Sequence, residues 1–253
     1  MSRIEGMQSS YIAMWSGPRN VSTALMRSFG SRADTVVIDE PLYAHYLRET
    51  GLEHPMREQI LASQDQDWRR VVAQLSAALP AGKSVSYQKH MAHHLLPDID
   101  TEWLVGFEQA FLIRDPRPML VSLERGLGRT PTLGDTGLPQ QAQLFEALRA
   151  RDGCPAAVLD SRDLLRDPAG ILSALCARLG LDFDPAMLSW EAGARETDGC
   201  WAPIWYAGTH ASTGFVTPDT RADVPVLSTA LEEVAQRAQP LFDLMYSERL
   251  AAH

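Results

Sequence analysis

Basic and hydroxyl side chains follow directly after a short apolar segment near the start of the chain. Residues 11–16 are apolar and end at a Gly-Pro pair, a pattern that predicts a buried strand followed by a turn. Residues 22–29 have a composition that suits a helix. Arg19, the loop hydroxyls and the first free amides of this helix have the chemistry to hold a phosphate group. The alternative is an ordinary turn capped by Ser22.

Further candidate residues lie just beyond two other predicted strands. His90 follows the segment 84–88, and Arg114 follows the apolar segment 109–113. Ser122 comes a little over two helical turns after Arg114, which places both on one side of a helix start, where they can meet the same anion. In an open parallel sheet the carboxyl ends of the strands form one edge, and ligands bind there.

The elements that must position these residues alternate between strand and helix. Short apolar or β-branched segments predict five strands, at 11–16, 35–38, 84–88, 109–113 and 156–160. Helical spacing predicts helices over 22–29, 56–79, 141–151, 168–179 and, with a kink at Pro240, 226–250. Asp-Pro pairs at 115, 167 and 184 predict three helix starts. This alternation predicts an α/β fold with a mostly parallel central sheet.

Composition excludes several classes of protein. The chain has 253 residues, of which 45% are hydrophobic and 22% charged, as in an ordinary globular protein without repeats or linkers. The formal net charge of −9 argues against nucleic acid or an anionic membrane as a general partner. Three cysteines without a CxxC pair disfavour a disulfide framework or a zinc site. No apolar segment is long enough for a membrane span or a secretory leader, so we expect a cytoplasmic protein.

These motifs, taken in order, resemble the bacterial sulfotransferases that use 3′-phosphoadenosine-5′-phosphosulfate (PAPS). In that family the first loop reads Pro, Lys or Arg, Ser, Gly and two hydroxyl residues, and residues 18–23 match at the first, second, fifth and sixth places. The family's catalytic histidine precedes a Leu-Leu-Pro sequence, as His90 does here. Its 3′-phosphate site is an Arg with a Ser at the spacing of Arg114 and Ser122. The segments 163–168 and 179–185 match two further stretches of bacterial members.

The resemblance implies a three-layer P-loop-type fold with helices on both faces of the sheet, forming one domain. Residues 10–185 would be its nucleotide-binding core, and 186–253 a closing loop and C-terminal helix. His90 would be the general base, and Arg19 would contact the bridging oxygen of the phosphosulfate. The remaining donor contacts would come from the phosphate loop, the 3′-phosphate site and the closing loop: Asn20, Val21, Ser22, Thr23, Ala24, Arg114, Ser122, Ser212, Thr213 and Gly214.

The chain departs from the family pattern at several places. Asn20 and Val21 replace the Ser-Gly of the phosphate loop, and Gln88 replaces a lysine two residues before the histidine. The family's C-terminal Gly-x-x-Gly-x-x-Lys is absent, and the segment 208–215 is the best substitute for it.

We therefore expect an enzyme that transfers a sulfonate from PAPS to a hydroxyl or amine of a small molecule, releasing 3′-phosphoadenosine-5′-phosphate (PAP) without a metal. Glu40 and His94 are the candidate residues for the acceptor pocket, although Glu40 is equally suited to capping a helix. The histidines at 90, 93 and 94 have spacing that also permits a metal site on one helix face. Other possibilities are a metal-dependent phosphotransferase, disfavoured by the missing Gly-Lys pair, and a nucleotide-binding module without catalysis. The sequence identifies neither the acceptor nor the oligomeric state.

Overall fold

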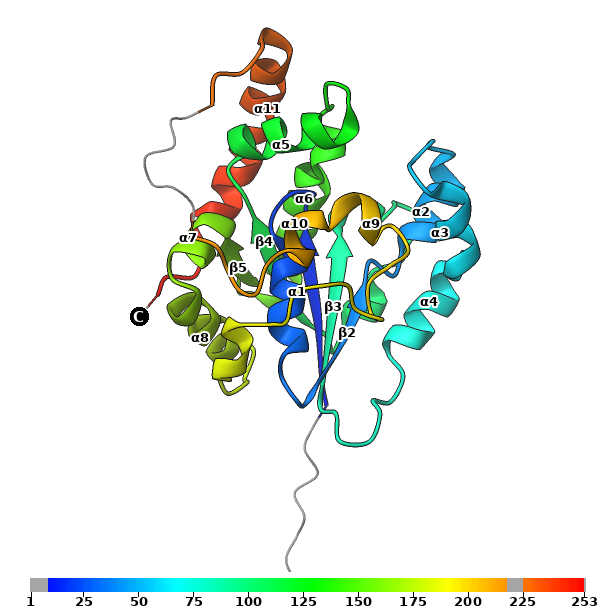
Figure 1. Cartoon of the computed structure of the whole chain (residues 1–253), viewed down its shortest axis with the longest axis vertical. Helices are drawn as coiled ribbons and strands as arrows, with labels where there is room; N and C mark the ends of the chain where they lie inside the picture. The colour runs from blue at the N-terminus through cyan, green and yellow to red at the C-terminus, as the bar shows by residue number, and fades with distance from the viewer. Residues whose placement is uncertain (1–8, 218–224, 253) are drawn as a thin grey trace, which may run out of the picture.

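A single parallel sheet forms the centre of the computed structural model, which describes residues 9–217 and 225–252 (Figure 1). Its five strands are β1 (Ser10–Ser16), β2 (Thr35–Asp39), β3 (Val85–Met91), β4 (Glu108–Ile113) and β5 (Ala157–Asp160). They lie in the order β2-β3-β1-β4-β5, and every neighbouring pair is parallel. The carboxyl ends of all five strands therefore meet at one edge, as the alternation of strands and helices predicts.

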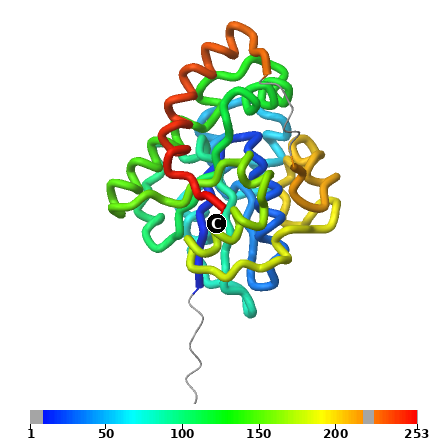
Figure 2. The backbone as a smooth tube through the Cα atoms, turned by 90° about the vertical axis from the view of Figure 1, so that its left-hand side faces the viewer, coloured from blue at the N-terminus to red at the C-terminus, as the bar shows by residue number. Residues whose placement is uncertain are grey.

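Helices cover both faces of this sheet. One face carries α1 (Ser22–Gly30) and α8 (Pro168–Arg178), which bury the side chains of Ile12 and Met14. The other face carries α5 (Pro116–Leu127), α6 (Leu138–Asp152) and α11 (Thr229–Tyr246), which bury Trp15 and Phe111. In Figure 2 the C-terminal helix α11, in orange and red, runs along one side of the molecule beside the green helices. The expected three-layer α/β fold is confirmed.

Shorter helices connect and surround these layers. They are α2 (Tyr43–Thr50), α3 (Arg57–Ser63), α4 (Trp68–Leu75), α7 (Ser161–Arg166), α9 (Ala202–Trp205) and α10 (Ala207–His210). The single helix predicted over 56–79 is wrong, because it is divided into α3 and α4. The side chain of Asp67 accepts a hydrogen bond from the amide of Arg69 and so starts a new helix. The third Asp-Pro pair starts only a 3-10 turn, Pro185–Leu188.

Strand β3 is longer than its sequence indicates, and this changes the expected site. The polar residues after Tyr87 suggest a strand end, yet all seven residues of β3 are buried and the strand continues to Met91. Because side chains alternate along a strand, Lys89 and Met91 face one side of the sheet and His90 faces the other. Between two partner strands, these polar side chains find their hydrogen bonds in the tertiary structure instead of in water.

The segment from Trp190 to Thr217 crosses the carboxyl edge of the sheet and contains α9 and α10. The sequence predicts an irregular loop here, and the part of that prediction covering 218–223 lies outside the described residues. Helix α11 follows with Pro240 inside it, as predicted. Among the described residues, no helix combines the length and the apolar character needed to cross a membrane.

Position 17, just before the loop around Arg19, has room only for glycine, because the backbone of another segment packs closely against it. A Cβ added there would lie 2.3 Å from the carbonyl oxygen of Thr136. We predict that Gly17→Ala lowers the free energy of unfolding by about 1–3 kcal/mol, the usual cost of overpacking. Urea unfolding measures this, with Gly208→Ala as the control, because no atom lies within 4 Å of a Cβ at Gly208. Equal stability of the two variants would contradict the contact.

Candidate functional site

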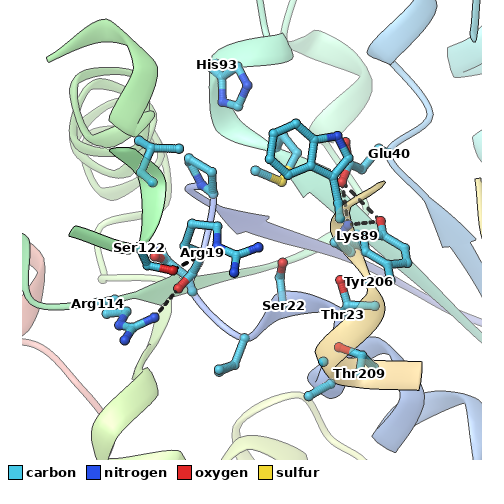
Figure 3. A pocket seen from close by; sticks show the side chains of 18 of the residues that line it. Arg19, Ser22, Thr23, Glu40, Lys89, His93, Arg114, Ser122, Tyr206 and Thr209 are labelled. Atoms are coloured by element: carbon cyan, nitrogen blue, oxygen red, sulfur yellow. Dashed lines mark hydrogen bonds and ion pairs between the residues drawn. The ribbon is translucent and has the colours of Figure 1, made fainter. Parts of the chain in front are cut away.

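A cavity of about 450 Å³ lies at the carboxyl edge of the sheet, in the size range of small-molecule sites (Figure 3). The ends of β2 and β3, the loops after β1 and β4, the start of α1 and the segment 190–217 all contribute to its walls. Twelve of the predicted site residues line it: Arg19, Asn20, Val21, Ser22, Thr23, Ala24, Glu40, His94, Arg114, Ser122, Ser212 and Gly214. His90 and Thr213 do not.

The phosphate loop leaves the first amides of α1 open toward the cavity. Val21 occupies the N-cap position of α1 and makes no side-chain hydrogen bond there. Ser22 is the first residue inside the helix, so it does not cap an ordinary turn, which was the alternative interpretation of this loop. Arg19 and Val21 have φ of 61° and 59°, left-handed values that are costly for a β-branched residue. Val21 stands where the family loop has glycine, and the left-handed conformation that glycine would favour is kept here despite its strain.

Two guanidinium groups without acidic partners lie beside this loop. The Arg19 Nε donates to Ser122 Oγ at 2.9 Å, and an Arg114 guanidinium nitrogen donates to the carbonyl oxygen of Arg19 at 2.5 Å. Within the described residues neither arginine forms an ion pair with a carboxylate. Partial burial lowers the pKa of both, and the Arg19 charge lowers the pKa of Arg114 further. Two unpaired cations beside open helix amides are suited to bind an anion with more than one charged group.

The other end of the cavity contains a buried ion cluster centred on Lys89. The Lys89 Nζ lies 2.8 Å from Asp39 Oδ1, 2.5 Å from Glu40 Oε1 and 2.7 Å from Tyr206 OH. The Tyr206 hydroxyl also lies 2.8 Å from Asp39 Oδ2 and accepts from Trp201 Nε1 at 2.9 Å. Every donor of the ammonium is therefore satisfied, as a buried charge requires.

This cluster leaves one carboxylate oxygen of Glu40 facing the cavity. Its Oε1 is held by Lys89, whereas Oε2 makes no hydrogen bond in the part of the chain that the structure describes. Burial raises the pKa of Glu40, and Lys89 opposes that effect without cancelling it. Glu40 also has φ of 45°, a strained conformation fixed in part by the hydrogen bond from its amide to the Lys89 carbonyl. A desolvated carboxylate with a free oxygen is suited to accept a proton.

The structure does not place His90, the predicted general base, in the cavity. Its ring stacks on Trp15 at a centroid distance of 4.4 Å, on the face of the sheet opposite the Lys89 side chain. Its Nε2 contacts the Gln88 side chain, and its exposed fraction is 1%. Burial lowers the pKa of His90 to about 3. The three further residues of β3, 89–91, explain the difference, because they keep residue 90 within the strand and its side chain on the face opposite that of Lys89.

The remaining predicted residues divide between lining and structural roles. Asn20 lines the cavity, but its Nδ2 donates to the carbonyl oxygen of Leu112 and so ties the loop to β4. Thr213 is exposed and lies outside the cavity, while its carbonyl oxygen accepts from Trp190. Lys89 and Tyr206 also line the cavity, although the sequence did not single them out as site residues; His93, considered above only as a possible metal ligand, and Thr209 line it too. The family's lysine before the histidine, displaced here by one position, was the only signal for Lys89.

The histidine spacing that permits a metal site is not realised as one cluster. His90 faces away from the cavity, whereas His93 and His94 line it and pack edge to face with ring centroids 4.5 Å apart. Within residues 9–217 and 225–252, no group of three or more acidic, cysteine or histidine residues is arranged to hold a metal ion.

Comparison with known proteins agrees with this architecture. A family model described as a sulfotransferase domain matches residues 10–249. Two proteins of Arabidopsis thaliana, called branched-chain-amino-acid aminotransferase-like protein 1 and protein 2, are 36% and 37% identical over 93% and 82% of the chain. The chain spans only 41% and 36% of the lengths of these two relatives, so their names describe much longer proteins.

Solved structures of the same fold include three sulfotransferases. The sulfotransferase domain of the olefin synthase of Synechococcus PCC 7002 aligns with a TM-score of 0.53 and 17% identity, covering 93% of this chain and 97% of that one. The domain from the curacin biosynthetic pathway aligns with a TM-score of 0.54 and 14% identity, covering 92% and 99%. A sulfotransferase from Alicyclobacillus acidocaldarius gives 0.50 and 12%, covering 96% and 97%.

Replacing Lys89 with an uncharged residue tests how far the buried carboxylates of the cluster depend on its positive charge. We predict that Lys89→Met lowers the free energy of unfolding at pH 8 by about 3–5 kcal/mol, because two carboxylates remain buried without a cation. In that variant the folded-state pKa of Glu40 lies well above its unfolded value. Folding of the variant then takes up a proton, so its loss of unfolding free energy relative to the wild type becomes smaller as the pH falls toward 5.5.

Urea unfolding at the two pH values measures this effect. Lys83→Met is the matched control, since Lys83 is the chain's other lysine and is only partly buried. If the difference in unfolding free energy between Lys89→Met and the wild type is the same at both pH values, Lys89 does not act as a counter-ion.

Proposed function

Because the chain belongs to the sulfotransferase domain family, we propose that it transfers a sulfonate group from PAPS to a hydroxyl of a small molecule, with Glu40 as the general base. The observation that carries this proposal is the division of one cavity into two ends. Unpaired arginines and open amides lie at one end, and a carboxylate with a free oxygen lies at the other. A transferase needs an anionic donor and a deprotonated acceptor in one space.

The donor end fits the charges of PAPS. The open amides of α1 and the Arg19 guanidinium would hold the 5′-phosphate and the bridging oxygen, with Ser22 and Thr23 beside them. Arg114 and Ser122 would hold the 3′-phosphate, which distinguishes this donor from AMP and ATP. Arg19 contacts both of these residues, so one set of side chains can bind two phosphate groups of one nucleotide.

The chemical step transfers a sulfonate between two oxygens. The acceptor oxygen attacks sulfur while the bond between sulfur and the bridging phosphate oxygen breaks, and PAP leaves with the negative charge. The acceptor proton moves to Glu40 Oε2, which the raised pKa of Glu40 favours. Arg19 and the helix amides stabilise the charge that develops on the leaving phosphate. Lys89 and Tyr206 hold Oε1 of the same carboxylate and so orient Oε2.

Glu40 is a better candidate for the base than the neighbouring histidine of the cavity. Burial lowers the pKa of His93 to about 4, which leaves a weak base. The family membership also favours sulfonate transfer over the metal-dependent phosphotransfer considered from sequence. A binding module without catalysis would have no need of a desolvated carboxylate opposite the anion site.

We predict that Glu40→Gln reduces kcat by about 10²–10⁴-fold, the usual contribution of a positioned general base. PAP affinity should change less than twofold, since Glu40 lies away from the arginines. The measurements are PAP release in an acceptor assay and calorimetric titration with PAP. Glu49→Gln, an exposed change on α2, is the matched control. Full activity of Glu40→Gln would remove Glu40 as the base.

Arg114→Ala should weaken PAP binding by about 1.5–3 kcal/mol, the value of a lost hydrogen bond to a charged group. AMP binding should be nearly unaffected, because AMP lacks the 3′-phosphate that Arg114 would contact. Calorimetry in magnesium-free buffer compares the two nucleotides, with the exposed Arg162→Ala as a control. If the wild-type protein binds PAP and AMP equally, the 3′-phosphate assignment is wrong.

A further inference from the structure

One wall of the cavity consists largely of rings. We call it the ring wall, and its members are Tyr43, Tyr46, His54, His93, His94 and Trp205, which all line the cavity. They form a continuous series, with His94 stacked on Tyr43 at 4.5 Å and on Tyr46 at 4.7 Å between ring centroids. His54 continues the series to Trp205 at 5.9 Å. Leu52 and Leu127 add apolar surface to the same cavity.

Much of the ring-wall surface is aromatic, and several of its polar atoms are not available to a ligand. The Tyr43 hydroxyl is already bonded to the Nδ1 of His54. The Nδ1 atoms of His93 and His94 are buried without a partner. An acceptor with several hydroxyls would leave them unpaired against these rings, at a cost for each buried polar group. An aromatic body can instead stack on the rings and bury apolar surface.

The cations at this end are all occupied, in contrast to the arginines of the donor end. Arg129 forms two hydrogen bonds of 2.8 Å with the carboxylate of Asp135. Lys89 is bound by the two carboxylates of its own cluster. Glu53 adds a further acidic group to the cavity lining. Burial lowers the pKa of His54, His93 and His94, so these imidazoles are neutral at pH 7. A carboxylate on the acceptor would meet acidic groups and no free cation.

The ring wall favours an aromatic group, and the cations near it are already paired with carboxylates. We therefore infer that the acceptor is an uncharged alcohol that carries an aromatic ring. Its hydroxyl would point to Glu40 Oε2, and its ring would lie against Tyr46 and Trp205. The inference rests on the proposed function, since it assigns this end of the cavity to the acceptor. It adds the substrate class, which neither the family nor the relatives specify.

The test compares three acceptors in the full chain: 2-naphthol, 6-hydroxy-2-naphthoate and methyl glucoside. With PAPS as donor, we expect kcat/KM for 2-naphthol to exceed the other two by at least tenfold. Calorimetric titration of the protein with each acceptor in the presence of PAP gives the same ranking without turnover. Equal or better use of the carboxylate or the sugar would overturn the inference and leave the proposed sulfonate transfer intact.

Two variants separate stacking from hydrogen bonding. Tyr46→Leu should weaken 2-naphthol binding at least fivefold, whereas Tyr46→Phe, which keeps the ring, should retain it. Tyr246→Leu on α11 is the matched control, because Tyr246 stacks on Phe242 in the helical layer that contains α5, α6 and α11. If 2-naphthol binds with PAP but no acceptor is ever sulfonated, the proposed function is wrong and the aromatic site stands. If 2-naphthol does not bind, or Tyr46→Leu leaves its affinity unchanged, the aromatic site is wrong.

Discussion

The ammonium of Lys89 holds the site together. It is 1% exposed and lies between two carboxylates that could not both remain ionised in the protein interior without it. Through Tyr206 it also connects the end of β3 to a segment 117 positions further along the chain. The same segment is attached to α1 by an ion pair of 2.7 Å between Arg27 and Asp198. The strand, the carboxylate of Glu40 and the covering segment thus share one buried network, which fixes where Glu40 can point.

Strain at the carboxyl edge of the sheet accompanies this network. Arg19, Val21 and Glu40 all have positive φ, although none is glycine. Such conformations persist only where surrounding contacts determine them. The loop is held by the Asn20 bond to β4 and by the close packing of Gly17 against Thr136, and the Glu40 backbone by its bonds to Lys89 and Gln64. These contacts within the chain hold the edge in one arrangement, as preorganisation of a site requires.

The sequence predicts the sheet, and the residues that gather around Arg19, because both depend on local patterns. Short apolar segments mark the strands within a few residues, and the loop around Arg19 and the Arg114–Ser122 spacing are read directly along the chain. The ion cluster depends on contacts between distant segments, which no local pattern contains. Buried polar residues of β3 resemble a strand end, so His90 was placed in the site and Lys89 was overlooked. Glu40 could be proposed as the proton acceptor only once the direction of each side chain was known.

One cavity has free cations at one end and a buried carboxylate at the other, and the proposed reaction requires a sulfonate to pass from the first end to the second. The most direct test is to incubate the protein with ³⁵S-labelled PAPS and 2-naphthol in magnesium-free buffer and to follow the label by chromatography. The account predicts that the label appears in the naphthyl sulfate as PAP is released in equal amount. Binding of PAPS without movement of the label to this or any other alcohol, or a reaction that requires magnesium and ATP instead, would contradict it.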